Sequence, residues 1–326
     1  MRESSYIPGF DWVRIIGSIL VAVTHCGVFM YFYNNTSQFY QLFSLLIPVF
    51  FIMSGYLRER SFSRQAVYSQ VLKYGAIYLA VNSLAVIYTH INALAHFGEF
   101  SWTGLIVNLF KGFVCRSDDA YQLWFIPALL YPMLLNAFLD KKGRRIVIVI
   151  SATLIIAREI IGNDVLEEEI GNVLSSLPII GKIFYAQELS RMWRHLLAGT
   201  LYTTIGFEID SWRLKPLALI LSAIPVAFLE FHTGHIVISP FLLSIALFLI
   251  VKKLPGHFMY PYHAAISLFS GMLYFLHRFE YIFIRGFITD SISLTILLII
   301  AFNLVVTIVV FLFINKGKER GNTAKV

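Results

Sequence analysis

Residues 11–32 read DWVRIIGSILVAVTHCGVFMYF, and Asp11 and Arg14 are the fully charged residues of this run. A helix needs about 20 mostly apolar residues to cross the hydrocarbon core of a bilayer. The run is long enough for that. It is too long for the core of a signal peptide, and it lacks a small-residue cleavage pattern. It therefore predicts a retained membrane-spanning helix.

The composition of the whole chain agrees with this prediction. Of its 326 residues, 58% are hydrophobic and 14% are charged, and the mean hydropathy is +0.72. A soluble domain carries about 25% charged residues, so this chain has too few polar side chains to cover a surface in water. Cys26 and Cys115 are too few for a disulfide framework and lack metal-site spacing. The sequence thus predicts an integral membrane protein.

Further apolar stretches of similar length follow along the chain. Together with the first run they give ten predicted spans: 11–32, 39–57, 68–90, 120–139, 145–162, 191–208, 214–230, 234–251, 264–285 and 291–314. Proline interrupts several of them, which membrane helices tolerate when neighbouring groups satisfy the freed carbonyl. No internal repeat is visible. We therefore predict an all-α polytopic protein with about ten transmembrane helices, built as a single domain over residues 1–326.

The basic residues of the connections predict the orientation, because cytoplasmic loops carry more Lys and Arg than outer loops. With the N-terminus in the cytoplasm, the cytoplasmic segments hold Arg58, Arg60, Arg64, Lys141, Lys142, Arg144, Arg145, Arg213, Lys215, Lys252, Lys253, Lys316, Lys318, Arg320 and Lys325. The outer segments hold Lys111, Arg116 and Lys182. Both termini are therefore predicted to be cytoplasmic, and the net charge of +7 reflects topology rather than nucleic-acid binding.

Two of the predicted outer connections, 91–119 and 163–190, are long. Loops of this length in a compact protein are usually functional or disordered, and these two are too apolar for disorder. Residues 102–114 have the pattern of a short amphipathic or re-entrant helix. We expect both connections to fold back over the outer face.

The first span carries the most informative polar side chains. At 100° per residue, Arg14 and His25 differ by only about 20° around the helix and lie about 16 Å apart along it. Asp11 falls within about 40° of the same line, and i,i+3 spacing allows it to pair with Arg14. One face thus carries a cation near the cytoplasmic surface and an imidazole deep in the bilayer. Alternatively, Arg14 extends to the inner headgroups and His25 packs against a polar neighbour.

Other polar side chains have structural explanations beside the functional ones. Ser54-Gly55 is typical of close helix packing, and Trp124 is typical of an interfacial anchor. The remaining polar candidates are Arg158 with Glu159, Arg191 with Arg194 and His195, Glu208, Arg278, Glu280, and the group Glu230, His232 and His235. A metal site at that last group is conceivable, but no second half of one is evident.

Four segments resemble motifs of the membrane-bound acyltransferase-3 family. Arg14, ten intervening residues and His25 match its R-x10-H signature. Residues 48–56, PVFFIMSGY, resemble its P-x-FF-x-x-SG-aromatic segment, residues 123–126, LWFI, its LWF motif, and residues 274–277, YFLH, its late Y-x-x-H segment. The family often has His immediately before its LWF motif, whereas this chain has Gln122 there. We therefore expect no second catalytic histidine at that position.

The resemblance implies a bacterial O-acyltransferase, one that transfers groups other than aminoacyl groups, in the inner (cytoplasmic) cell membrane. Acetyl-CoA or another acyl-CoA would be the donor, and a hydroxyl of a cell-envelope saccharide the acceptor. Arg14 would bind donor phosphate, and His25, kept neutral by burial, would act as the base. Further candidates for donor or acceptor binding are Asp11, Ser54, Tyr56, Arg58, Trp124 and His277. No metal is expected, and the expected partners are lipid, acyl-CoA and an envelope glycan.

Two other functions fit the same spans. A transporter of a small polar substrate, such as an amino acid, would also need broken helices and charges near the membrane midplane. A non-catalytic component of polysaccharide export would need only the scaffold of helices. Dependence on acyl-CoA distinguishes the enzyme from both.

Overall fold

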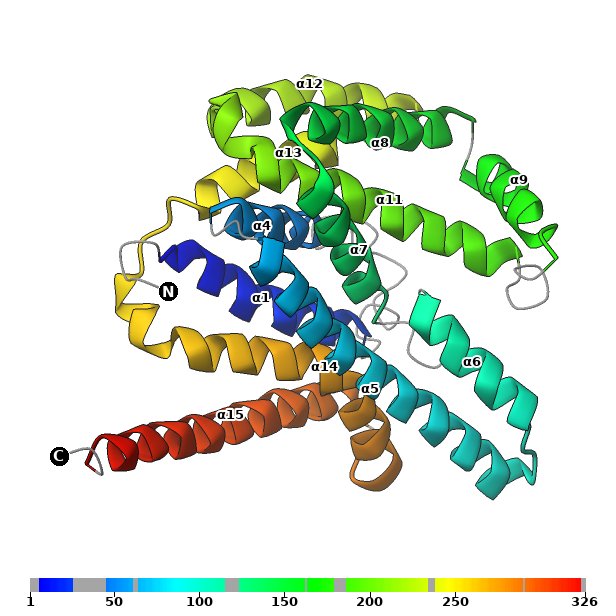
Figure 1. Cartoon of the computed structure of the whole chain (residues 1–326), viewed down its shortest axis with the longest axis vertical. Coiled ribbons are helices and arrows are strands. Elements are labelled where there is room, and N and C mark those ends of the chain that lie inside the picture. Colours follow the sequence, from blue (N-terminus) through cyan, green and yellow to red (C-terminus); the bar gives the residue numbers. More distant parts are fainter. Residues whose placement is uncertain are drawn as a thin grey trace. The chain divides into compact units, whose positions relative to one another are not determined.

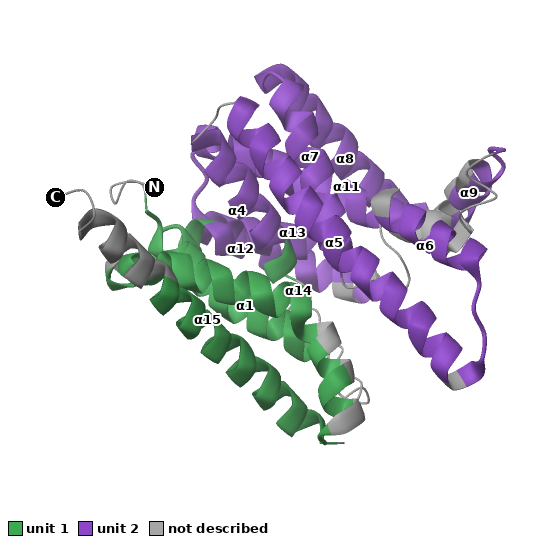
Figure 2. Ribbon diagram, turned by 60° about the horizontal axis from the view of Figure 1, so that its bottom comes forward, with its two compact units in different colours: residues 1–47, 249–326 green, residues 48–248 purple. Residues whose placement is uncertain are grey.

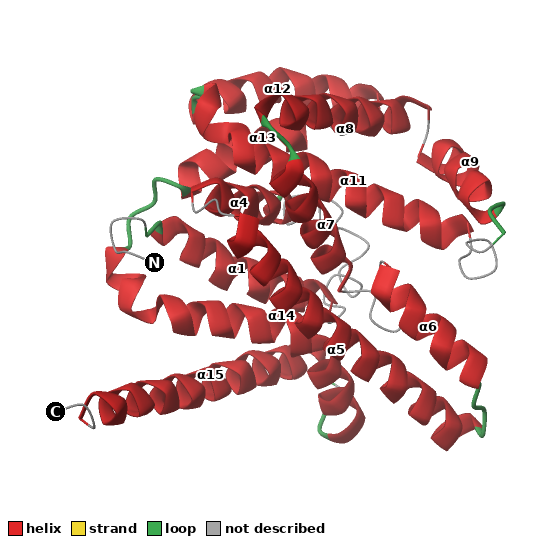
Figure 3. Ribbon diagram, viewed as in Figure 1, coloured by secondary structure: helices red, strands yellow, loops and turns green. Residues whose placement is uncertain are grey.

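The computed structural model describes residues 6–25, 45–60, 64–114, 123–161, 163–178, 186–233, 238–289 and 291–323. All regular structure within these ranges is helical, without a strand (Figure 3). The all-α prediction is therefore confirmed for the part of the chain that is described.

The α-helices follow the order of the predicted spans (Figure 1). They are α1 (Pro8–His25), α4 (Leu46–Arg60), α5 (Arg64–Phe97), α6 (Trp102–Val114), α7 (Phe125–Phe138), α8 (Lys141–Ile161), α9 (Asn163–Ser175), α11 (Ala186–Glu208), α12 (Pro216–Thr233), α13 (Ile238–Val251), α14 (His263–Phe287) and α15 (Ile292–Thr323). Each predicted span overlaps one helix, and the predicted short helix at 102–114 is α6. Helix α9 lies in a connection for which we predicted no helix.

Polar side chains cap several helix starts. Asp140 accepts the backbone N–H of Gly143 at 2.7 Å and so begins α8, and Ser101 does the same for Gly104 at 3.0 Å in α6. Helix α1 begins with Pro8, whose missing N–H is not needed in the first turn. Asp11 lies in that first turn, where a negative charge faces the positive end of the helix dipole.

Contacts divide the chain into two compact units, residues 1–47 with 249–326 and residues 48–248 (Figure 2). In the first unit, α14 packs against both α1 and α15. An apolar cluster of Ala22, Phe269, Leu273, Ile284 and Ile299 joins these three helices. The prediction that the chain is one domain stays a prediction.

In the second unit, α11 packs against α7, α8 and α9, and glycines allow its backbone to approach its neighbours. A Cβ added at Gly206 would lie 2.2 Å from the carbonyl oxygen of Ile52 in α4, and one at Gly55 would lie 2.1 Å from that of Thr203. Gly199 is equally close to Ala128 in α7, at 2.0 Å. The packing interpretation of Ser54-Gly55 is thus confirmed for Gly55.

Two helices of the described part are long and apolar enough to cross a membrane, within residues Arg64–Ala95 and Ile292–Phe313. The apolar segments Phe125–Phe138, Pro216–Glu230 and Ile238–Val251 are shorter. The two long helices indicate an association with membranes. The predicted number of crossings stays a prediction.

Candidate functional site

A buried carboxylate lies at the start of α1. Asp11 is fully buried, and it accepts a hydrogen bond from the Tyr6 hydroxyl at 2.6 Å and one from Arg14 Nη1 at 2.7 Å. The Asp11–Arg14 pair, which we predicted from their spacing, is therefore confirmed. Burial and the adjacent carboxylate raise the pKa of Tyr6 above its ordinary value, so its hydroxyl stays protonated and donates.

His263, the first residue of α14, completes this arrangement. Its Nδ1 lies 2.9 Å from Asp11 Oδ2 and 3.0 Å from Oδ1. An ionised carboxylate can only accept hydrogen bonds, so Nδ1 carries the proton and donates. Arg14 Nη1 lies 3.3 Å from the same Nδ1 because both groups donate to one carboxylate. We call Tyr6, Asp11, Arg14 and His263 the carboxylate cluster.

Close packing holds the cluster together. A Cβ at Gly9 would lie 1.7 Å from the carbonyl oxygen of Val251, so the backbones touch there. Gly256 has a φ of +143°, which residues other than glycine rarely adopt, and it lies against Pro8 and Trp12, where a Cβ would be 3.2 Å and 3.3 Å from their side chains. The ring of Tyr6 meets His263 edge-on, with centroids 5.5 Å apart. The start of α1 and the start of α14 are therefore fixed relative to each other.

Helices α1 and α14 run in the same direction from this contact, side by side in Figures 1 and 2. His277 follows His263 by the same number of residues as His25 follows Asp11. At 1.5 Å per residue, both positions lie about 21 Å beyond the cluster, at one level of two adjoining helices. His25 is the last residue of α1, and its side chain lies outside the described part of the structure.

His277 is fully buried, and its Nδ1 is hydrogen-bonded within its own helix. Nδ1 lies 2.8 Å from the carbonyl oxygen of Leu273, one turn earlier in α14. A carbonyl can only accept, so Nδ1 carries a proton. The hydrogen bond to Leu273 thus fixes the orientation of the ring within α14.

The other predicted site residues lie in the second unit. Ser54 Oγ donates to the carbonyl oxygen of Phe50 at 2.8 Å, within its own helix. Tyr56 is buried and meets Phe248 edge-on, with centroids 5.4 Å apart. Arg58 is half-buried at the end of α4. Their roles in binding stay predictions.

Trp124 lies in an aromatic group rather than alone at the start of α7. Its ring stacks on His195 of α11, with centroids 3.9 Å apart and planes 23° apart. The neighbouring Phe125 packs on Phe51 at 4.4 Å. The segments PVFFIMSGY and LWFI therefore meet here, together with His195, one of the polar candidates of the sixth predicted span.

Two further glutamates, Glu230 and Glu280, accept hydrogen bonds from neighbouring residues. Glu230 accepts the backbone N–H groups of Ile238 and Ser239 and the Ser239 hydroxyl, so it caps α13. His235 lies outside the described residues, and among those described no three His, Cys, Asp or Glu side chains are grouped as metal ligands would be. In the first unit, Asn303 Nδ2 donates to Glu280 Oε2 at 2.7 Å.

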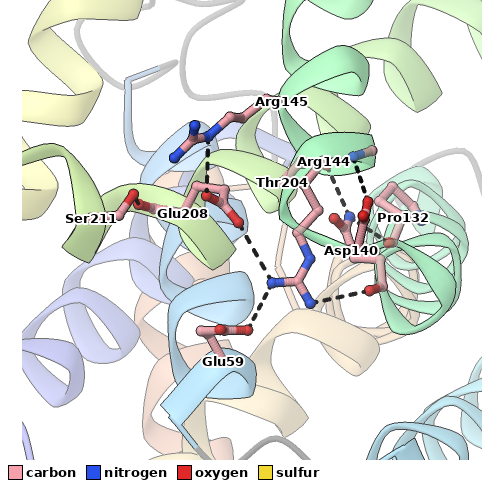
Figure 4. Close-up of polar contacts among 10 residues, drawn as sticks. Glu59, Pro132, Asp140, Arg144, Arg145, Thr204, Glu208 and Ser211 are labelled. Atoms are coloured by element: carbon pink, nitrogen blue, oxygen red, sulfur yellow. Dashed lines mark hydrogen bonds and ion pairs between the residues drawn. The ribbon is translucent and has the colours of Figure 1, made fainter.

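A second charge cluster, in which Arg144 and Glu208 are buried, joins α4, α8 and α11 (Figure 4). Arg144 Nη1 lies 2.9 Å from Glu59 Oε2 and 3.7 Å from Glu208 Oε1, and its guanidinium covers the ring of Phe207 at 4.7 Å. Arg145 Nε lies 3.9 Å from Glu208 Oε2. We call Glu59, Arg144, Arg145 and Glu208 the arginine cluster. Arg144 was predicted only as a basic loop residue, but it is buried.

No family model, curated protein or solved structure matches this chain.

Proposed function

We propose that the chain crosses a bilayer about ten times, as the number of apolar stretches indicates. The observation that supports this is the placement of its side chains. Large apolar side chains face outward along whole helices, including Leu217, Leu221, Ile224, Phe228 and Leu229 of α12 and Leu294, Leu297, Leu304, Ile308 and Phe313 of α15. Polar side chains are buried instead, including Asn82, Asn136, Thr204, Ser244, His277 and Asn303. Apolar surface of that extent suits lipid and not water.

The two clusters support the proposed orientation. The arginine cluster brings together residues that follow the second predicted span, precede the fifth and end the sixth. All three positions were assigned to the cytoplasmic side from loop charges alone. The carboxylate cluster likewise joins the start of the first span to the start of the ninth, which are both assigned to that side. Within each cluster, the contacting residues therefore come from helix ends that were assigned to the same, cytoplasmic side, as the proposed orientation requires.

Cysteine labelling in intact cells tests this topology. In a background without the native cysteines, Lys142→Cys and Lys253→Cys are expected to react with a membrane-impermeant maleimide only after the cells are opened. Glu99→Cys and Ser291→Cys are expected to react from outside, because Glu99 lies in a connection assigned to the outer face and Ser291 begins the tenth predicted span at that face. Each unit thus contributes one position to each side. Reaction of both members of a pair from the same side contradicts the proposed orientation.

We propose that the protein is an O-acyltransferase that uses cytoplasmic acyl-CoA. The observation that carries this is Arg14, whose guanidinium is oriented by a buried carboxylate and remains partly exposed at the proposed cytoplasmic face. His25 lies three turns deeper on the same helix. Arg14 binds a phosphate of the donor by charge-assisted hydrogen bonds, and the flexible pantetheine arm carries the thioester toward the level of His25.

The proposed reaction at that level is a transfer of the acyl group from sulfur to oxygen. A hydroxyl of an envelope saccharide attacks the thioester carbonyl, and His25 takes the hydroxyl proton as the new C–O bond forms. The tetrahedral intermediate collapses with cleavage of the C–S bond. The proton then passes from His25 to the departing thiolate, so that free CoA and the acylated saccharide are the products.

Purified protein in liposomes, supplied with radiolabelled acetyl-CoA and an envelope glycan extract, tests the activity. Label is expected in the glycan, together with free CoA thiol in equal amount. Heat-denatured protein is the control for chemical acetylation. Movement of a substrate across the liposome membrane without consumption of acetyl-CoA contradicts the enzyme.

A transporter is the second candidate, and the Glu280–Asn303 pair favours it. This pair links α14 and α15 by a polar contact within two predicted spans. Polar side chains inside a membrane often mark a substrate or ion path. Substrate uptake that requires Glu280 but not acyl-CoA would support this alternative.

A further inference from the structure

We infer that His263 is a second phosphate ligand, which binds the acyl donor together with Arg14. This inference rests on the proposed acyl-CoA-dependent function. It assigns a binding role to a residue of α14 that lies far from Arg14 in sequence.

The first argument is the difference in exposure among the side chains of the carboxylate cluster. Asp11 is fully buried and receives hydrogen bonds from Tyr6, Arg14 and His263. Tyr6 is buried too, whereas the side chains of Arg14 and His263 are 20% and 27% exposed. The carboxylate of Asp11 is thus buried, and the accessible parts of the cluster belong to the guanidinium of Arg14 and the imidazole of His263.

The second argument is the direction of the imidazole. Its Nδ1–H donates to Asp11, so Nε2 is the nitrogen on the opposite edge of the ring. When the ring is protonated, Nε2–H is a donor. Arg14 uses Nη1 for Asp11 and keeps other N–H groups of its five-donor guanidinium for a ligand. Asp11 therefore orients the guanidinium and the imidazole, and Arg14 and the protonated form of His263 each keep an N–H that does not contact this carboxylate.

The third argument is the distance between the two groups. Arg14 Nη1 and His263 Nδ1 are 3.3 Å apart. Both of these nitrogens donate to Asp11, so the guanidinium and the imidazole lie side by side. Their remaining N–H groups can together bind two oxygens of one phosphate or adjacent oxygens of a pyrophosphate, for which bidentate recognition adds both strength and specificity. A structural role alone does not need His263, because Arg14 already neutralises Asp11. The ligand chemistry is thus a phosphate ester, which either the donor or a lipid headgroup could supply.

Binding measurements on the full chain in nanodiscs of zwitterionic lipid test the inference. His263→Asn keeps an amide N–H near the position of Nδ1, so the contact with Asp11 is expected to survive while the outward donor is lost. We expect CoA to bind roughly 10- to 100-fold more weakly, as for loss of a hydrogen bond to a charged group. Pantetheine, which has no phosphate, is expected to bind as it does to the unchanged protein. His232→Asn, at an exposed histidine of α12, is the matched control.

The outcomes separate the inference from the function on which it rests. If the unchanged protein binds CoA and His263→Asn binds it equally well, the inference is wrong while the donor proposal stands. If the unchanged protein does not bind CoA, the proposed function itself fails. Native mass spectrometry in nanodiscs with anionic lipid distinguishes the lipid source: loss of bound anionic lipid on substitution, with CoA affinity unchanged, makes this a headgroup site. His263→Gln replaces His263→Asn if thermal unfolding shows that the latter does not fold.

Discussion

His25→Ala is expected to lower the rate of acyl transfer by about 10²- to 10⁴-fold, the contribution of a positioned general base. The imidazole is the group proposed to take the hydroxyl proton, and alanine leaves no group at that position to do so. Binding of CoA at the cytoplasmic face is expected to stay unchanged, because the carboxylate cluster lies at the other end of α1. The measurement is the single-turnover rate in liposomes, with CoA affinity measured in parallel.

Thr24→Val is the matched control for this substitution. Thr24 precedes His25 in α1, and its hydroxyl donates to the carbonyl oxygen of Leu20 within the same helix. Its replacement changes the polarity of the last turn without removing a proposed catalytic group, so transfer is expected to continue. A His25→Ala protein that inserts, folds and transfers at the unchanged rate would rule out the proposed mechanism.

His277 offers a related comparison within the same unit. Its Nδ1 is held by the carbonyl oxygen of Leu273, and its position is level with residue 25 of the adjoining helix. If the two histidines serve one transfer step, the double substitution is expected to cost little more than His25→Ala alone, since residues that act as a unit are not additive. If the two histidines act independently, the fold-losses in transfer rate of the two single substitutions are expected to multiply in the double variant.

Local features of the chain were predictable from the sequence, and distant pairings were not. The Asp11–Arg14 pair follows from i,i+3 spacing on one helix. His263 joins the same carboxylate from the far end of the chain, and nothing in its own surroundings, Tyr260-Pro261-Tyr262, indicates a partner on α1. The contact depends on the packing of α14 against α1, and hydrophobic periodicity within one segment does not indicate which helix it packs against.

The same limit explains the stack of Trp124 on His195 and the burial of Arg144. Each residue has an ordinary explanation within its own segment, as an interfacial aromatic or a basic loop residue. In the structure Arg144 is covered by α4, α7 and α11, because it contacts Glu59, the backbone of Asn136 and the ring of Phe207. A composition pattern identifies a charge near a membrane surface, but only packing shows whether water reaches it.

Arg144→Met is expected to destabilise the second unit by about 3–5 kcal/mol, the cost of leaving a buried charge without its partner. Methionine retains an apolar stem against Phe207, so the loss is mainly electrostatic. Glu208 then has its carboxylate 1% exposed, and within the described part of the chain Arg145, at 3.9 Å, is the cation that remains beside it. Thermal and denaturant unfolding of the protein in detergent measures the change.

The partners of Arg144 predict an order among the variants. Glu208→Gln removes the buried negative charge but leaves Arg144 paired with Glu59 at 2.9 Å, so it is expected to cost less than Arg144→Met. Combining the two substitutions is expected to recover part of the loss, because no carboxylate is then buried without a cation. Lys142→Met, at an exposed neighbour on α8, is expected to have little effect. If Arg144→Met and Lys142→Met unfold alike, the arginine cluster does not stabilise the packing of α4, α8 and α11.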